Sequence, residues 1–360
     1  MTAAATAPAA PPPVLARAPA ESDDALRAQA LAIHRRTCIA DIHTHGLLGI
    51  GYLGLDLGRG GPGLSRRNPL RNILDLVDLP RAREGGVKAL VFVSYVLPSP
   101  LKRYDEKTKR MVAAFRRFLA RHEGRIEQAF AADDVARINA GGKIAAILAV
   151  EGGHALGGRL AMLEWLREAG AVYLTLTHFV NNDLSASATH PGRDYGLTPR
   201  GREALREMER LGILADLSHS SRRAKRDAFR LARAPLICSH TGLRRFWGAA
   251  RATGDDEVRA VAATGGLVGL LLSPVFLAGR TRAGVEAIVA NVDHICSLVG
   301  ADHVCIGSDF DSGLPPPDGM RDLRDYPEIT VALVRRGYDE ETIAKIWSGN
   351  FFRVLRAVGR

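Results

Sequence analysis

Residues 143–151 have the sequence KIAAILAVE, in which the seven positions after the lysine are apolar and the last position is a glutamate. A short apolar run without polar alternation is typical of a parallel strand that is buried on both faces. Glu151 therefore stands where a buried strand leaves its sheet. Gly152 and Gly153 follow, and they allow the chain to turn closely past whatever the carboxylate binds. This stretch predicts a parallel α/β sheet with polar chemistry at the carboxyl ends of its strands.

Seven further runs of this kind are spread along the chain, and amphipathic segments such as 159–170 and 220–233 lie between most of them. The eight runs occupy 37–43, 87–95, 143–151, 171–178, 212–219, 234–240, 266–273 and 303–309. Eightfold alternation of strand and helix predicts an α/β fold closed as a (β/α)8 TIM barrel. Residues 1–21, rich in Ala and Pro, are expected to be a disordered tail. Residues 22–360 are expected to form a single domain, with Ser22 capping its first helix.

Six of the eight runs end in, or lie next to, a side chain that can bind a metal. These side chains are His43, His45, Glu151, His178, His219, His240 and Asp309. Closure of a barrel would bring them to the carboxyl ends of the strands, where barrel enzymes hold their active sites. The pair in His43-Thr44-His45 would be weak evidence alone, because two histidines at a strand end are often simply hydrogen-bonded. Unpaired polar groups at buried strand ends are costly, so the full set predicts a metal site.

The expected ligand atoms are nitrogen and oxygen without thiolate, which suits Zn²⁺ and also permits Mn²⁺, Co²⁺ or Fe²⁺. Five histidines and a glutamate able to bridge exceed what one catalytic zinc requires, so two zinc ions are expected. Such a pair can share a hydroxide that acts as nucleophile near neutral pH. A histidine that binds no metal can stabilise an oxyanion. Asp309 is expected to orient or deprotonate the water and to pass its proton on, and it is preferred over Asp311.

Other polar or glycine-rich features are expected to be structural. The stretches GIGYLG at 49–54 and GRGGPG at 58–63 match GxGxxG, but neither is followed by a clear helix in a βαβ unit. A flexible glycine-rich loop is therefore expected there, and no dinucleotide site. His154 is expected to form a hydrogen bond in a loop. The remaining histidines have no partner by spacing: His34, His122, His190, His294 and His303.

Composition excludes several classes of partner. The formal charge is +10, from 49 basic and 39 acidic residues, but the basic residues are scattered. No aromatic and basic recognition motif accompanies them, so nucleic-acid binding is not expected. Four cysteines without a CxxC pair predict neither a disulfide framework nor a thiolate site, and they suit a cytoplasmic protein. No stretch approaches the ~18–20 apolar residues of a membrane span, and residues 1–20 lack the apolar core of a signal peptide.

Six motifs, in order between about residues 38 and 356, resemble those of the membrane (renal) dipeptidase family, peptidase family M19, of the binuclear-metal amidohydrolase superfamily. They are VEGGHAL, YLTLTHFVNN, GILADLSHSS, APLICSHTG, IGSDFDSG and SGNFFRVL. The resemblance implies a binuclear zinc-dependent dipeptidase that hydrolyses the peptide bond of dipeptides by a metal-bridging hydroxide. It also implies tolerance of a D-residue at the C-terminal position of the substrate.

The resemblance also implies a role for each matching residue. His43, His45 and the bridging Glu151 would hold one zinc. Glu151, His219 and His240 would hold the other. His178 would contact the substrate and the tetrahedral intermediate, Asp309 would handle the proton, and Arg251 would bind the substrate carboxylate. From the sequence alone, Arg251 would instead be interpreted as one of many surface arginines.

One position departs from the family pattern, which usually has His-x-Asp where this chain has His45 as the second residue. A neutral imidazole in place of a carboxylate makes the site about one charge more positive, so a more acidic bridging water and an altered metal preference are expected. This departure, with the glycine-rich loop at 46–63, favours as an alternative a related amidohydrolase acting on another amide, a lactone or a phosphoester. A non-enzymatic basic binding protein on a barrel fold is a third hypothesis, based on the charge alone. Barrels of this kind often form homodimers, although the sequence identifies no interface.

Overall fold

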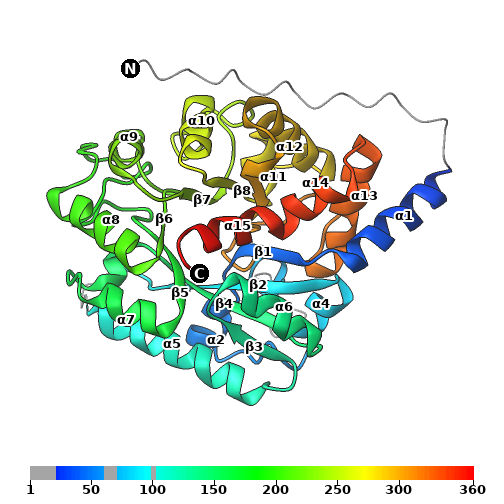
Figure 1. The fold of residues 1–360 in the computed structure, drawn as a ribbon, viewed down its shortest axis with the longest axis horizontal. Coiled ribbons are helices and arrows are strands. Elements are labelled where there is room, and N and C mark those ends of the chain that lie inside the picture. The colour runs from blue at the N-terminus through cyan, green and yellow to red at the C-terminus, as the bar shows by residue number, and fades with distance from the viewer. Residues whose placement is uncertain (1–21, 61–70, 99–102) are drawn as a thin grey trace.

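The computed structural model describes residues 22–60, 71–98 and 103–360, and the expected tail at 1–21 lies outside the described residues. The described strands form one parallel sheet that curves into a nearly closed barrel with helices around it (Figure 1). They are β1 (Ile39–Thr44), β2 (Val87–Tyr95), β3 (Ile126–Ala129), β4 (Ile144–Glu151), β5 (Ala171–Thr175), β6 (Leu214–Asp216), β7 (Leu236–Thr241), β8 (Leu267–Leu270) and β9 (Val304–Ile306). Their order is β1-β2-β4-β5-β6-β7-β8-β9, with β3 beside β4. The predicted (β/α)8 barrel is confirmed.

Helices connect the strands and cover the outside of the barrel (Figure 1). The described α-helices are α1 (Asp23–Arg36), α2 (Gly46–Leu53), α3 (Arg71–Leu74), α4 (Leu79–Glu84), α5 (Tyr104–Arg121), α6 (Ala132–Ala140), α7 (Met162–Ala169), α8 (Pro199–Leu211), α9 (Arg222–Leu231), α10 (Asp255–Ala263), α11 (Pro274–Ala278), α12 (Val285–Val299), α13 (Tyr326–Arg336), α14 (Glu340–Ala344) and α15 (Asn350–Ala357). Ser22 caps α1 as predicted, since its hydroxyl accepts a hydrogen bond from the Ala25 amide at 3.3 Å. No helix of the described residues is long and apolar enough to cross a bilayer.

Two local features differ from the sequence-based expectation. The expected loop after the first strand begins with helix α2, whose Leu47 side chain is buried. The helix ends at Gly54, which adopts a left-handed conformation at φ 64°. The last residues of that expected loop, 61–63, lie outside the described residues. Strand β3 was not predicted, because its sequence IEQA is short and polar in the middle. It pairs with the first half of β4, and β5 pairs with the second half.

The barrel closes through the buried end of β1. Thr44 forms a parallel bridge with Phe310, and the Asp309 amide donates to the His43 carbonyl at 2.9 Å. Asp41 strengthens this closure, because its carboxylate accepts the Ser308 amide at 2.9 Å and also the Ser308 hydroxyl. Burial raises the pKa of Asp41 to about 6. The ends of the first and last strands are thereby held together, and the polar residues that follow them are brought to one place.

Close backbone contact inside the barrel gives a stability prediction. A Cβ atom on Gly269, in β8, would lie 1.9 Å from the Ser239 carbonyl oxygen of β7. Gly269→Ala should therefore lower the free energy of unfolding by about 3 kcal/mol in a urea titration. Gly124→Ala is the matched control, because a Cβ atom there would meet no atom within 4 Å. Equal urea midpoints for Gly269→Ala and Gly124→Ala would contradict this tight packing between β7 and β8.

Candidate metal centre

Glu151, the last residue of β4, lies between two pairs of buried histidines. On one side its Oε2 is 3.4 Å from His45 Nε2, and its Oε1 is 3.8 Å from His43 Nε2. On the other side Oε1 is 3.0 Å from His219 Nε2 and 3.3 Å from His240 Nε2. The structure thus brings together all five residues that were expected to be metal ligands.

The four histidines of the cluster differ in where they stand relative to the strands and helices. His43 lies in β1 and His240 in β7. His219 follows β6 by three residues, because that strand is shorter than the apolar run that predicted it. His45 stands at the N-cap position of α2, and its side chain makes no capping hydrogen bond with the helix. The imidazole of His45 is instead turned toward Glu151.

The spacing of the ligand atoms fits two divalent cations that share Glu151. In a tetrahedral zinc site with bonds of about 2.0–2.1 Å, ligand atoms are roughly 3.3 Å apart. The Nε2 atoms of His43 and His45 are 3.3 Å apart, and those of His219 and His240 are 3.0 Å apart. With Glu151, each pair forms a group of three ligand atoms within 4.8 Å of one another.

The electrostatics of the cluster also fit cations. Both carboxylate oxygens of Glu151 are buried, and neither has a hydrogen-bond partner in the described part of the chain. Burial raises the pKa of Glu151 to about 8. Burial also lowers the pKa of His43, His219 and His240 well below the ordinary value, so these imidazoles are neutral. Burial acts in the same direction on the pKa of His45, but the neighbouring Asp309 and Glu151 carboxyl groups raise that pKa overall. A divalent cation would satisfy this donor set of one buried carboxyl group and four imidazoles.

A third group of potential ligands, His43, Asp216 and His240, lies beneath the first two. Asp216 ends β6, and its carboxylate accepts hydrogen bonds from Thr175 Oγ1 at 2.6 Å and from Ser239 Oγ at 2.7 Å. Its other oxygen accepts from the hydroxyl and amide of Ser218 and from the Ser239 amide. Both carboxylate oxygens of Asp216 are therefore already hydrogen-bonded within the protein. Asp216 was not predicted as a functional residue, although an aspartate inside an apolar run was a usable signal.

His178 and Asp309 flank the cluster. His178 Nε2 is 3.7 Å from Glu151 Oε2, and burial lowers the pKa of His178 well below its ordinary value. Asp309 Oδ1 is 3.0 Å from His45 Nε2. Asp311 instead accepts the Leu76 amide at 2.7 Å. The structure thus places Asp309, rather than Asp311, beside the candidate metal ligands.

Arg251 lies in the loop after β7 and is only 4% exposed. Its guanidinium donates to the His240 carbonyl at 2.8 Å and to Thr241 Oγ1 at 3.3 Å, and its Nε has no partner. Within the described residues, no carboxylate lies within ion-pair distance of this guanidinium. A buried charge without a counter-ion is costly, so this position suits an anionic group brought by a ligand. The sequence-based interpretation of Arg251 as a surface residue is wrong, and its placement follows the family resemblance.

Two aromatic residues beside the cluster were not predicted. Tyr95 ends β2, and its ring centroid is 4.4 Å from that of His178. Phe179 is 58% exposed, and its ring is 3.9 Å from that of His178. The signal for Tyr95 was its position at the end of the run 87–95, where other runs carry a candidate ligand. Together these rings give the surroundings of His178 an apolar character.

The remaining predicted features fall outside the cluster. His154 Nε2 donates to the Val96 carbonyl at 2.8 Å, as expected for a loop hydrogen bond. Hydrogen bonds to groups elsewhere in the protein are also made by ring nitrogens of four other histidines: His34, His122, His294 and His303. All four cysteines are free, in agreement with the prediction of no disulfide framework.

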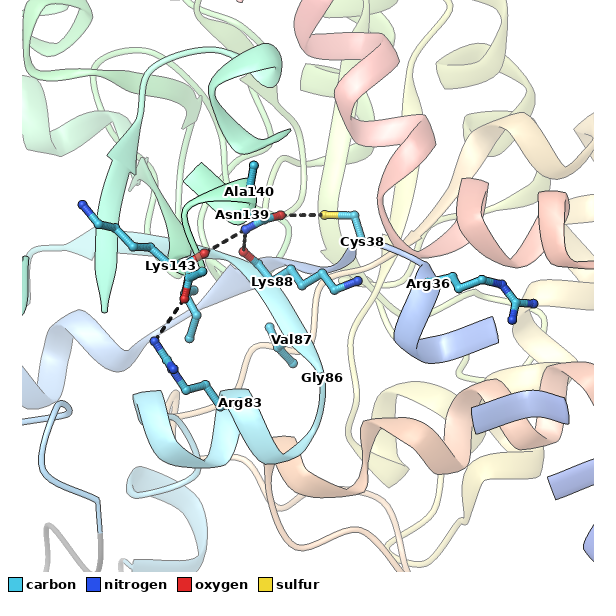
Figure 2. Close-up of a pocket in the computed structure, with 11 residues that line it drawn as sticks. Arg36, Cys38, Arg83, Gly86, Val87, Lys88, Asn139, Ala140 and Lys143 are labelled. Atoms are coloured by element: carbon cyan, nitrogen blue, oxygen red, sulfur yellow. Dashed lines mark hydrogen bonds between the residues drawn. The ribbon is translucent and has the colours of Figure 1, made fainter. Parts of the chain in front are cut away.

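A separate cavity of about 550 Å³ opens at the amino ends of β1, β2 and β4 (Figure 2). The histidine cluster lies at the other ends of these strands. Basic side chains line it, but they already have protein partners. Lys88 Nζ donates to two backbone carbonyls at 2.7 Å, Lys143 Nζ is 2.9 Å from Glu127, and Arg83 donates to the Gly142 carbonyl. The contacts therefore indicate no ligand for this cavity.

Comparison with known proteins identifies the family of this chain. The family model for membrane dipeptidase, peptidase family M19, matches residues 27–360. The chain belongs to peptidase family M19. It is 33% identical over 306 residues to Dipeptidase tcpJ of Claviceps purpurea, covering 81% of this chain and 72% of that protein. It is 30% identical over 355 residues to Dipeptidase 3 of Rattus norvegicus, and this match covers 94% of this chain and 68% of that protein.

Solved structures agree with this membership of family M19. A metallo peptidase from Rhodobacter sphaeroides, liganded with a phosphinate mimic of the dipeptide L-Ala-D-Ala, is 26% identical and has a TM-score of 0.79. The match covers 89% of this chain and 99% of that one. The M19 protein described here is therefore a metallopeptidase-family hydrolase of peptide bonds, and the hypothesis of a non-enzymatic binding protein is wrong.

Proposed function

We propose that this M19 protein is a binuclear zinc dipeptidase that hydrolyses dipeptides with a free C-terminal carboxylate. The observation that carries the proposal is the position of Glu151 between two histidine pairs, with no hydrogen-bond partner on either carboxylate oxygen. His43 and His45 would hold one cation with Glu151, and His219 and His240 would hold the other. Cations there would polarise the substrate carbonyl and lower the pKa of a shared water to about 7, which supplies the hydroxide nucleophile.

The flanking residues would carry out the remaining steps. Asp309, beside His45, would accept the proton of the attacking water and transfer it to the leaving amine. His178 is neutral, and it would donate a hydrogen bond to the carbonyl oxygen as negative charge develops there. Both groups would act on atoms of the same peptide bond, which is consistent with the position of His178 beside Glu151 and of Asp309 beside His45.

The substrate would be recognised through its carboxylate. Arg251 offers a buried guanidinium without an acidic partner among the described residues, and a charge-assisted pair with the substrate would satisfy it. Because Arg251 also donates to the His240 carbonyl, the carboxylate would lie close to the scissile bond, which limits substrates to very short peptides. The phosphinate mimic of L-Ala-D-Ala in the Rhodobacter relative supports a dipeptide, including one that ends in a D-residue.

Elemental analysis together with a dipeptide panel tests this function. We expect about two divalent ions per chain, hydrolysis of at least one dipeptide, loss of hydrolysis on chelation, and recovery with Zn²⁺. The panel should include a simple lactone and a phosphoester, which test the alternative amidohydrolase. Two bound ions with turnover of the lactone or phosphoester, but of no dipeptide, would replace the proposed function by that alternative.

A further inference from the structure

Ser239, which directly precedes His240 in β7, contacts one histidine from each side of the cluster. Its Oγ is 3.1 Å from His43 Nδ1 and 2.9 Å from His240 Nδ1. Ser239 is completely buried. These two imidazoles belong to different ones of the two groups that contain Glu151, and both present their Nε2 atoms toward Glu151. One hydroxyl therefore lies behind both halves of the candidate metal centre.

The hydrogen-bond inventory fixes where the imidazole protons lie. Ser239 Oγ has one hydrogen, and it donates this hydrogen to Asp216 Oδ2 at 2.7 Å. Toward the imidazoles it can then only accept. Tyr173 donates to the Ile42 carbonyl at 2.9 Å and lies 2.8 Å from His43 Nδ1, so it also accepts from that ring. Both Nδ1 atoms are thus protonated, and both Nε2 atoms keep a lone pair, which is the tautomer that a metal requires.

The other two candidate ligands lack such support. The Nδ1 atoms of His45 and His219 are buried, and neither has a hydrogen-bond partner among the residues described. In each group of three, only the histidine that contacts Ser239 is held from behind through a hydrogen bond. One ligand in each group thus contacts the same hydroxyl, and His43 is held in addition by Tyr173.

Asp216 would remain in place without the Ser239 hydroxyl. It also accepts from Thr175 Oγ1 at 2.6 Å, from Ser218 Oγ at 2.6 Å, and from the backbone amides of Ser218 and Ser239. Removal of one hydroxyl leaves four of its five hydrogen bonds. The effect of a Ser239 substitution should therefore fall on the imidazoles rather than on the fold.

We propose that Ser239 is a positioning residue shared by the two metal groups, a role that rests on the proposed two-metal function. Its hydroxyl donates to Asp216 and accepts hydrogen bonds from His43 and His240. It thereby sets the tautomer of both imidazoles and helps to orient both rings. Loss of the hydroxyl weakens both cation-binding steps, and it weakens the step that uses His240 more, because His43 keeps its contact with Tyr173.

The experiment titrates the metal-free full chain with Zn²⁺ in competition with a chromophoric chelator and compares Ser239→Ala with the wild type. Both binding steps should weaken by about 10–100-fold, while the thermal midpoint of the metal-free protein stays unchanged. Ser239→Thr, which keeps a hydroxyl, should restore most of the affinity. Thr175→Val is the matched control, because it removes an equally short hydrogen bond to Asp216, while the Thr175 hydroxyl bonds neither Ser239 nor a histidine in the described part of the chain. Its zinc affinities should remain within about twofold of the wild type.

Three results would overturn the proposal: unchanged affinities in Ser239→Ala, weakening of a single step, or an equal loss in Thr175→Val. The last result would assign the effect to Asp216 and its packing. Failure of the proposed function is distinguishable from these results, because the titration needs no turnover. A wild-type protein that binds two zinc ions but hydrolyses no dipeptide contradicts the dipeptidase proposal alone.

Discussion

Glu151→Gln is expected to abolish the binding of both cations and to lower kcat/KM for a dipeptide by about 10⁴-fold, or ~5.5 kcal/mol at 1.36 kcal/mol per decade. The physical reason is that one carboxylate serves both groups, with its oxygens within 3.0–3.8 Å of four imidazoles. A carboxamide has the same shape but carries no charge, and one of its two ends is a donor. Elemental analysis and dipeptide hydrolysis measure the two effects independently.

Although Glu151→Gln should lose cation binding and activity, it should gain stability when no metal is present. Burial raises the pKa of Glu151 to about 8 in the folded protein, above its ordinary value of 4.5. A carboxyl with a raised pKa binds its proton more tightly when folded, so the metal-free wild type loses stability as pH rises from about 4.5 to 8. Glu151→Gln lacks this loss and should be the more stable metal-free protein at pH 9 in chelator.

A control separates these effects from a general loss of a carboxylate. Glu127 lies on β3, outside the cluster, and pairs with Lys143 and Arg137. Glu127→Gln should keep both cations and full activity, since surface ion pairs contribute little. Retention of two zinc ions per chain by Glu151→Gln would contradict the bridging position assigned to this residue.

Arg251→Met is expected to lower kcat/KM for a dipeptide by about 10³-fold, or ~4 kcal/mol, while the zinc content stays at the wild-type level. The loss reflects a substrate carboxylate left without its guanidinium in a buried position. For the same dipeptide with a C-terminal amide, which has no charge to pair, wild type and variant should differ little. The measurement is therefore the ratio of kcat/KM for acid and amide in each protein.

The acid-to-amide ratio distinguishes substrate recognition from a structural role of the arginine. Arg251 also donates to the His240 carbonyl, so its removal could displace that ligand. Displacement of His240 would lower activity on both substrates equally and would reduce the zinc content, and that outcome would contradict carboxylate recognition. Arg282→Met, at a side chain that is 82% exposed, controls for the loss of one positive charge.

Much of the fold was predictable because it depends on local patterns. A short, continuous apolar run such as 144–150 is typical of a strand covered on both faces, and repeated alternation with amphipathic segments favours a parallel arrangement. In a parallel barrel all carboxyl ends meet at one face, so residues that end the runs, such as Glu151 and His240, could be expected to converge. Strand β3 and helix α2 were missed, because IEQA carries no strand pattern and GLLGIGYL is rich in glycine.

The eight predicted strands and the residues at their ends follow from local sequence, since each depends on neighbours within one run of the chain. Which strand ends face one another follows instead from long-range contacts. These contacts divide the histidines into pairs on either side of Glu151 and bury Arg251 without an acidic partner in the described chain. They also place Ser239 behind His43, 196 residues away in sequence. Such contacts depend on strand register and on closure of the barrel between Thr44 and Phe310, which no single segment encodes.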